Sequence, residues 1–162
     1  MKEKDTDKSS TDCLLIKEKE SSLEQISAIA ELLYEELMQD QKTFCLWLKG
    51  PLGAGKTSIV GAILRRIGLS EKVPVSSPTF SYLNDYKIKT DYFAHMDLYR
   101  LTGGSEEDFL SHKSYRGIFI EWPRPLDGFP EATHLLEIDY PYDGPKSNHR
   151  HYRFFRCTPT QN

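Results

Sequence analysis

The segment Gly50-Pro51-Leu52-Gly53-Ala54-Gly55-Lys56-Thr57 decides the fold class of this chain, because it matches the phosphate-binding pattern G-x-x-x-x-G-K-[ST]. Its glycines allow backbone conformations that other residues would forbid, so that successive amides point toward phosphate oxygens. The lysine would then reach the β and γ phosphates of a nucleotide, and the threonine hydroxyl would bind Mg²⁺. The residues expected to contact the nucleotide are Leu52, Gly53, Ala54, Gly55, Lys56, Thr57 and Ser58.

The sequence on both sides of this loop fits the same interpretation. Residues 43–48, TFCLWL, are almost wholly apolar, as expected for a central strand that is covered on both faces. Residues 57–67 repeat apolar side chains at helical spacing, and Gly68 follows as a stop signal. A glycine-rich turn without a ligand would not require this arrangement, so the strand, loop and helix together favour a nucleotide site.

The remaining sequence predicts further strands and helices. An amphipathic helix is expected over residues 23–39, after a serine pair that resembles the start of a capping box. The sequence Gly103-Gly104-Ser105 predicts a loop that opens a short helix. The expected strands are residues 13–16, 79–88, 92–99, 117–121, 135–140 and 151–157, with 79–88 and 92–99 forming a hairpin. This order predicts an α/β fold, a P-loop NTPase-like three-layer sandwich with a mostly parallel central sheet and an antiparallel hairpin or edge strands.

The length of 162 residues fits one domain. Residues 1–12 are polar and charged, so we expect a disordered tail ahead of a single P-loop ATPase domain over residues 13–162. No apolar run reaches the roughly 18 residues that a membrane helix needs, and the charged N-terminus lacks the apolar stretch of a signal peptide. The protein is therefore expected in the cytoplasm, without a membrane partner.

Charge and cysteine content argue against two classes of protein, those that bind nucleic acid by themselves and those stabilised by a disulfide framework. A formal net charge of −3 lacks the basic excess of a protein that neutralises nucleic-acid phosphates by itself. The three cysteines, Cys13, Cys45 and Cys157, lie far apart without metal-ligand spacing, and their odd number argues against a disulfide framework. A reducing compartment and no direct contact with nucleic acid are therefore expected.

Two acidic residues at the ends of predicted strands are candidates to hold Mg²⁺ and to align the water that attacks the nucleotide. Glu121 closes the apolar run Ile118-Phe119-Ile120, and Asp97 closes a less apolar run at residues 93–96. A P-loop site needs such a carboxylate beside the phosphate loop. A carboxylate at a strand end also commonly starts a loop or faces solvent, and the sequence does not decide which of Asp97 and Glu121 aligns the water.

Four motifs, in their order and spacing, resemble the TsaE (YjeE) family of bacterial proteins. They are the phosphate loop, Ser77-Pro-Thr-Phe80, His95-Met-Asp-Leu-Tyr-Arg-Leu101 and Ile120-Glu-Trp-Pro123. The resemblance implies an ATPase subunit of the machinery that makes threonylcarbamoyladenosine in tRNA, with ATP and Mg²⁺ as cofactors. It also implies TsaD-like and TsaB-like partners, with tRNA reached only indirectly through their complex.

The resemblance assigns roles to individual residues. Thr57 and Glu121 are similar to magnesium ligands of the family, and Asp97 is similar to a second acidic residue that aligns water or metal. Thr79 resembles a switch element that senses the γ phosphate. Together with Lys56, the residues Asp97, Glu121 and Thr79 form the expected catalytic set.

Trp122 and Arg150 correspond to two further features of the family. Trp122 is similar to a mobile aromatic residue, although an isolated tryptophan is as often core or cover. Arg150, together with Arg153, resembles an R-x-x-R step that approaches the nucleotide, and a solvated strand edge is the favoured alternative for it. Residues 102–116 form a shorter segment than is usual for the family, so the partner-facing surface is expected to differ.

Three functions remain open at this point: a partner-dependent ATPase, a small-molecule kinase, and a nucleotide-sensing scaffold without turnover. A GTPase is disfavoured, because no Asn-Lys-x-Asp segment is present to read guanine. A kinase usually brings an arginine-bearing lid, for which only residues 102–116 offer room. No arginine is clearly aimed at the γ phosphate, so an ATPase of this kind is expected to be weak without its partners.

Overall fold

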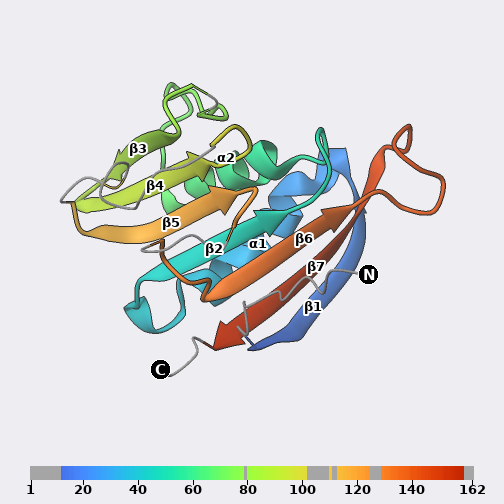
Figure 1. Cartoon of the computed structure of the whole chain (residues 1–162), viewed down its shortest axis with the longest axis horizontal. Helices are drawn as coiled ribbons and strands as arrows, with labels where there is room; N and C mark the ends of the chain where they lie inside the picture. Colours follow the sequence, from blue (N-terminus) through green and yellow to red (C-terminus); the bar gives the residue numbers. More distant parts are fainter. Residues whose placement is uncertain (1–11, 79, 102–109, 111–112, 125–128, 159–162) are drawn as a thin grey trace, which may run out of the picture.

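A seven-stranded mixed sheet forms the frame of the protein in the computed structural model, which describes residues 12–78, 80–101, 110, 113–124 and 129–158 (Figure 1). The spatial order of the strands is β1-β7-β6-β2-β5-β4-β3. The strands are β1 (Asp12–Ser22), β2 (Phe44–Lys49), β3 (Leu83–Ile88), β4 (Asp91–Asp97), β5 (Tyr115–Glu121), β6 (His134–Asp139) and β7 (His149–Thr158). The helices are α1 (Ile26–Leu37) and α2 (Lys56–Ile67), with short 3-10 turns at Leu23–Gln25 and Gln39–Gln41.

The centre of the sheet is parallel and its edges are antiparallel, which confirms the predicted fold class. Strand β2 lies between β5 and β6 and is parallel to both, and β4 is parallel to β5. Strands β3 and β4 form the predicted hairpin at one edge, and β7 runs antiparallel to β6 and β1 at the other. The carboxyl ends of β2, β4 and β5 consequently lie together at one end of the parallel strands. This is where α/β proteins bind their ligands.

Each face of the sheet buries its own apolar core. Helices α1 and α2 pack side by side on one face, where Leu33, Leu46 and Ile63 are fully covered (Figure 1). On the other face, Leu98, Leu101 and Phe129 cover the side chains of Cys45 and Ile120. In the described ranges, the layer on this second face consists of non-helical segments, and the helix expected after residues 103–105 lies outside those ranges.

The boundaries of several predicted elements differ from the structure. Strand β1 continues past residue 16 through a polar stretch to Ser22, because it pairs with β7 along its whole length. Helix α1 begins at Ile26, after the 3-10 turn Leu23–Gln25. Ser21, near the end of β1, donates a hydrogen bond to the Gln25 side chain rather than capping the helix backbone. Strands β6 and β7 each begin before their predicted first residues. Of the expected tail, residues 1–11 lie outside the described ranges, and Asp12 is the first residue of β1.

The expectation of unpaired cysteines was wrong, because Cys13 and Cys157 form a disulfide. The antiparallel register places Cys13 of β1 opposite Cys157 of β7, although they are separated by 144 residues in the sequence. Cys45 is the free cysteine of the described chain, and burial raises the pKa of its thiol to about 12. The disulfide therefore ties the first and last described strands together at the edge of the sheet.

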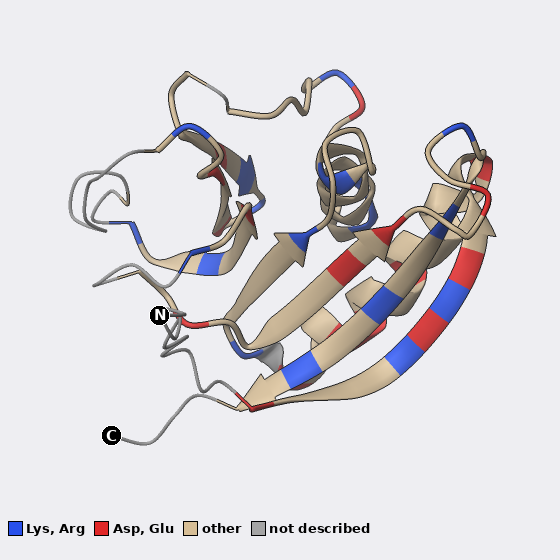
Figure 2. Ribbon diagram, turned by 45° about the vertical axis from the view of Figure 1, so that its right-hand side comes forward, with Lys and Arg blue, Asp and Glu red and all other residues tan. Residues whose placement is uncertain are grey.

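The outer wing, which we define as strands β1, β7 and β6, carries many charged side chains (Figure 2). Basic and acidic residues alternate along β1, whereas the charged residues of β7 are basic and those of β6 are acidic. Arg153 of β7 forms ion pairs with Glu137 and Asp139 of β6, and His151 lies 2.7 Å from Glu18 of β1. These pairs lie on half-exposed side chains. None of the described helices has the length and apolar character that a membrane span requires.

Candidate nucleotide-binding site

The loop between β2 and α2 depends on glycine at two positions. A Cβ atom on Gly50 would lie 2.4 Å from the backbone oxygen of Ile138 in β6, so only glycine fits this close approach. Gly55 is the residue before α2 and has a φ of +106°, a conformation that L side chains rarely adopt. The first amides of a helix have no intrahelical acceptor, so the start of α2 presents N–H groups to an anion.

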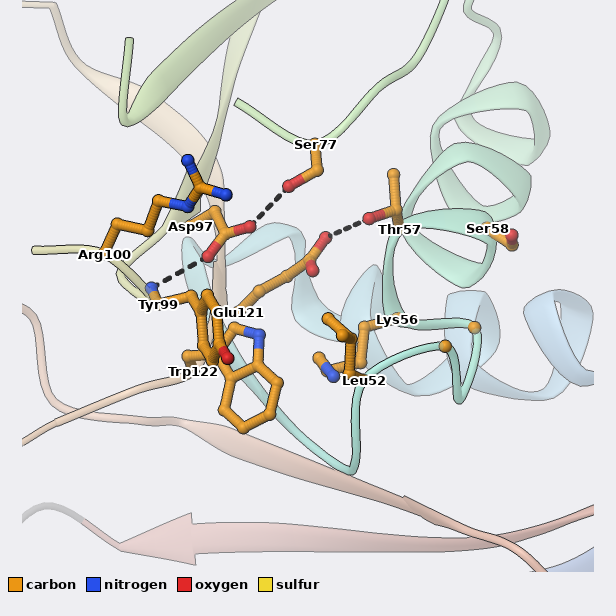
Figure 3. Close-up of a pocket in the computed structure, with 12 residues that line it drawn as sticks. Leu52, Lys56, Thr57, Ser58, Ser77, Asp97, Tyr99, Arg100, Glu121 and Trp122 are labelled. Carbon is orange, nitrogen blue, oxygen red and sulfur yellow. Dashed lines mark hydrogen bonds between the residues drawn. The ribbon is translucent and has the colours of Figure 1, made fainter. Parts of the chain in front are cut away.

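A cavity of about 420 Å³ opens in front of this loop (Figure 3). It lies at the carboxyl ends of β4 and β5 and at the N-terminus of α2. The predicted nucleotide residues that line it are Leu52, Gly53, Gly55, Lys56, Thr57 and Ser58, and the other lining residues are Ser77, Asp97, Tyr99, Arg100, Glu121 and Trp122. The structure therefore brings the phosphate loop and both candidate acids to one cavity.

Asp97 and Glu121 lie side by side, because β4 and β5 are parallel neighbours and these two residues are register partners. Glu121 accepts a 2.8 Å hydrogen bond from the Thr57 hydroxyl at the start of α2. Asp97 accepts hydrogen bonds from the Ser77 hydroxyl and from the backbone N–H of Tyr99, the latter at 2.9 Å. Figure 3 shows these groups facing one another across the cavity.

Lys56 points back into its own loop in this structure. Its ammonium donates hydrogen bonds to the backbone oxygens of Gly50, at 2.7 Å, and Pro51, at 3.0 Å. The indole ring of Trp122 covers the ammonium at 4.1 Å, with the Trp122 backbone at a φ of +55°. Burial lowers the pKa of Lys56 below its ordinary value, while the nearby carboxylates of Glu121 and Asp97 oppose that shift. The ammonium is thus held close to the place where phosphate oxygens would attract it.

The donor set at the cavity suits Mg²⁺ better than a metal that needs a complete protein shell. Thr57 and Glu121 would supply oxygen ligands to such a cation, and Asp97 lies nearby as a second carboxylate. Across the part of the chain that the structure describes, no three or more His, Cys, Asp or Glu side chains are grouped to hold a metal ion. Mg²⁺ usually takes one or two protein oxygens and completes its octahedron with water and substrate phosphate.

The other predicted site residues lie elsewhere. Ala54 is fully buried behind the loop and does not line the cavity. Arg150 is also buried, and its guanidinium donates hydrogen bonds to the backbone oxygens of Ala54, Ser147 and His149. The Arg150 side chain thus contacts the backbone of the loop from outside the cavity. Thr79 lies outside the described residues.

Two residues at the site, Arg100 and His95, were not predicted from the sequence. Arg100 lines the cavity, whereas Arg150 is the arginine that the sequence places near the nucleotide. The place of Arg100 could have been inferred, because it lies three residues after Asp97, the last residue of β4. His95 hydrogen-bonds Glu121 from within β4, which depends on the pairing of two strands that are far apart in the sequence.

Comparisons with known proteins agree with this architecture. The family model described as threonylcarbamoyl adenosine biosynthesis protein TsaE matches residues 20–151. A "tRNA threonylcarbamoyladenosine biosynthesis protein TsaE" from Haemophilus influenzae is 36% identical over 70% of this chain and 72% of its own length. The protein of the same name from Aquifex aeolicus is 32% identical over 63% of this chain and 75% of its own length.

One solved structure supports the fold although its sequence identity to this chain is low. The crystal structure of Bacillus subtilis YdiB superposes with a TM-score of 0.64 and covers 91% of this chain and 88% of its own, at 21% identity. The family model covers most of the chain and includes the phosphate loop, both acidic strand ends and β6. This chain therefore belongs to the TsaE family.

Proposed function

We propose that this protein is a magnesium-dependent ATPase of the cytoplasm that supports threonylcarbamoyladenosine modification of tRNA together with TsaD-like and TsaB-like proteins. The modification is named for the TsaE family and for the relatives described above. The ATPase activity is inferred from the site. Its main support is the hydrogen bond from Thr57 to Glu121 at a cavity that the glycine loop and Lys56 also line.

Each residue of the site has a definite task in this proposal. The amides at the start of α2 and the Lys56 ammonium bind the β and γ phosphates. The Thr57 hydroxyl donates a hydrogen bond to Glu121, so the lone pairs of its oxygen remain for the cation. Mg²⁺, when bound, would offset the charge that develops on the phosphate oxygens. Glu121 and Asp97 accept hydrogen bonds from the water that attacks the γ phosphate, and Arg100 adds positive charge at the rim.

The position of Lys56 is a reason to expect weak activity from the isolated chain. To reach a phosphate, its ammonium leaves the oxygens of Gly50 and Pro51 and the face of Trp122. P-loop proteins without a fully positioned arginine hydrolyse at roughly 10⁻⁴ to 10⁻² per second, and a partner can add about 10³- to 10⁵-fold. We expect the TsaD-like and TsaB-like proteins to complete the site in this way, with tRNA bound by their complex.

The test is ATP hydrolysis by the purified chain, first alone, then with the TsaD-like and TsaB-like proteins, then with tRNA added. The proposal expects slow hydrolysis alone and strong stimulation by the partners, with ATP preferred over GTP. Transfer of phosphate to an added alcohol or nucleoside would instead identify a small-molecule kinase. Nucleotide binding without stimulation in any combination would identify a nucleotide-sensing scaffold.

A further inference from the structure

His95 is the fifth residue of β4 and its side chain is fully buried. It faces the same side of the sheet as Asp97, because side chains two residues apart in a strand point the same way. Its register partner on β5 is Phe119, so Glu121 is its diagonal neighbour. Across this diagonal the His95 Nε2 atom lies 2.7 Å from the Glu121 Oε1 atom.

The other ring nitrogen of His95 has no partner. Among the described residues, Nδ1 of His95 is the one buried side-chain nitrogen or oxygen without a hydrogen bond. Buried polar atoms without a partner are rare in folded proteins, because the group loses its contact with water and gains nothing in return. An apolar side chain at this position would avoid that loss, so the histidine is expected to have a task at its Nε2 atom.

The hydrogen bonds determine where the proton lies. An ionised carboxylate accepts hydrogen bonds and cannot donate them, so the Nε2 atom must carry the proton that reaches Glu121. The alternative, a protonated Glu121 that donates to Nε2, would leave an N–H group at Nδ1 buried without an acceptor. The neutral Nε2–H tautomer avoids this, because only a lone pair is then left unpaired.

The consequence for Glu121 concerns its two oxygens. Oε1 accepts hydrogen bonds from both Thr57 and His95, which lie on different elements. Two donors on one oxygen fix the rotation of the carboxylate and leave Oε2 for other partners. We propose that His95 is a positioning residue that, as its Nε2–H tautomer, holds Glu121 Oε1 against Thr57 and thereby reserves Oε2 for the magnesium shell and the attacking water.

This inference rests on the proposed ATPase function, and its test separates the two. The first measurement is nitrogen NMR of the nucleotide-free chain labelled in histidine. The proposal expects His95 to carry its proton on Nε2, with a bare Nδ1, and its signals to change in Glu121→Gln. A proton on Nδ1 would overturn the proposal whether or not the chain hydrolyses ATP.

The second measurement compares His95→Leu, which removes the donor, with His95→Gln, whose amide can place an N–H group near the position of Nε2. Removal of such a supporting hydrogen bond typically costs about 10- to 100-fold in activity or metal affinity. We expect this loss of kcat, and a higher Mg²⁺ requirement, in His95→Leu, with ATP binding in the absence of Mg²⁺ unchanged. His95→Gln should recover most of the loss.

The matched control is His134→Leu, since His134 is a partly buried histidine beside a carboxylate, Glu36, but lies away from the cavity. It should keep the parental kcat and Mg²⁺ requirement. Parental values in His95→Leu would overturn the positioning role. A parent chain that neither binds nor hydrolyses ATP would refute the proposed function, while the NMR result would still test the hydrogen bond.

Discussion

The cavity at the phosphate loop and the outer wing both contain many charged groups, but the cavity buries most of them and the wing leaves most of them partly or fully exposed. In the wing, Arg153 and its partner Asp139 keep 39% and 50% of their side-chain surfaces exposed, so water screens the pair. At the cavity, the side chain of Glu121 is only 4% exposed and faces the fully buried His95. Burial of charge is costly, so the difference indicates that the cavity keeps its charged groups for chemistry rather than for stability.

The largest expected effect comes from the buried carboxylate at the cavity. Glu121→Gln keeps the shape of the side chain but removes the negative charge that would hold Mg²⁺ and align water. We expect turnover, measured with the partner proteins, to fall by about 100-fold or more, with a much smaller change in ATP affinity. Glu137→Gln on β6 is the matched control from the wing, and an equal loss of turnover there would remove the contrast between the two regions.

Arg150 belongs to the wing by its strand but contacts the phosphate loop, so it tests the boundary between the two regions. Its guanidinium donates hydrogen bonds to three backbone oxygens, among them that of Ala54. We expect Arg150→Ala to lower the free energy of unfolding by about 2 to 3 kcal/mol and to weaken ATP binding, because the loop loses its support. Denaturant unfolding and calorimetry measure the two effects. Unchanged stability would show that these hydrogen bonds do not anchor the loop.

Arg153 lies three residues further along β7 and points to solvent. Its ion pairs with Glu137 and Asp139 are exposed, and pairs of this kind contribute about 1 kcal/mol or less. We therefore expect Arg153→Ala to change the free energy of unfolding by no more than that and to leave turnover unchanged. Loss of ATP affinity in this variant, measured beside Arg150→Ala, would favour a direct nucleotide role for the R-x-x-R step.

The smallest expected effect is a pH dependence of stability from His134 on β6. Burial lowers the pKa of His134 below its ordinary value of 6.5, although Glu36 opposes the shift. The unfolded chain then binds more protons near this pH, so the free energy of unfolding falls as the pH decreases through and below 6.5. His134→Gln should make this decrease less steep in denaturant unfolding at a series of pH values. An unchanged slope would contradict the assignment to His134.

The sequence predicted the features that depend on neighbouring residues. The strand, glycine loop and helix from Phe44 to Ile67 follow from local patterns of apolar residues and glycines, and the hairpin of β3 and β4 follows from alternation and a short turn. These local signals placed Lys56 and Thr57 correctly at the start of α2. They also placed both candidate acids at strand ends.

What the sequence could not predict depends on the pairing of distant strands. The adjacency of Asp97 and Glu121 comes from the register of β4 and β5, and the disulfide of Cys13 with Cys157 comes from the register of β1 and β7. The second half of β1 is polar and carries no strand pattern of its own. It is a strand because it pairs with β7. His95 was hidden for the same reason, since its partner Glu121 lies on another strand.

We propose that the loop before α2 binds the phosphates of ATP through Lys56. Calorimetric titration of magnesium-ATP into the parent chain and into Lys56→Ala tests it most directly. A hydrogen bond to a charged group contributes about 1.5 to 3 kcal/mol, so we expect the variant to bind about 10- to 100-fold more weakly. Equal affinity of the two chains for magnesium-ATP would contradict the assignment of this cavity to the nucleotide.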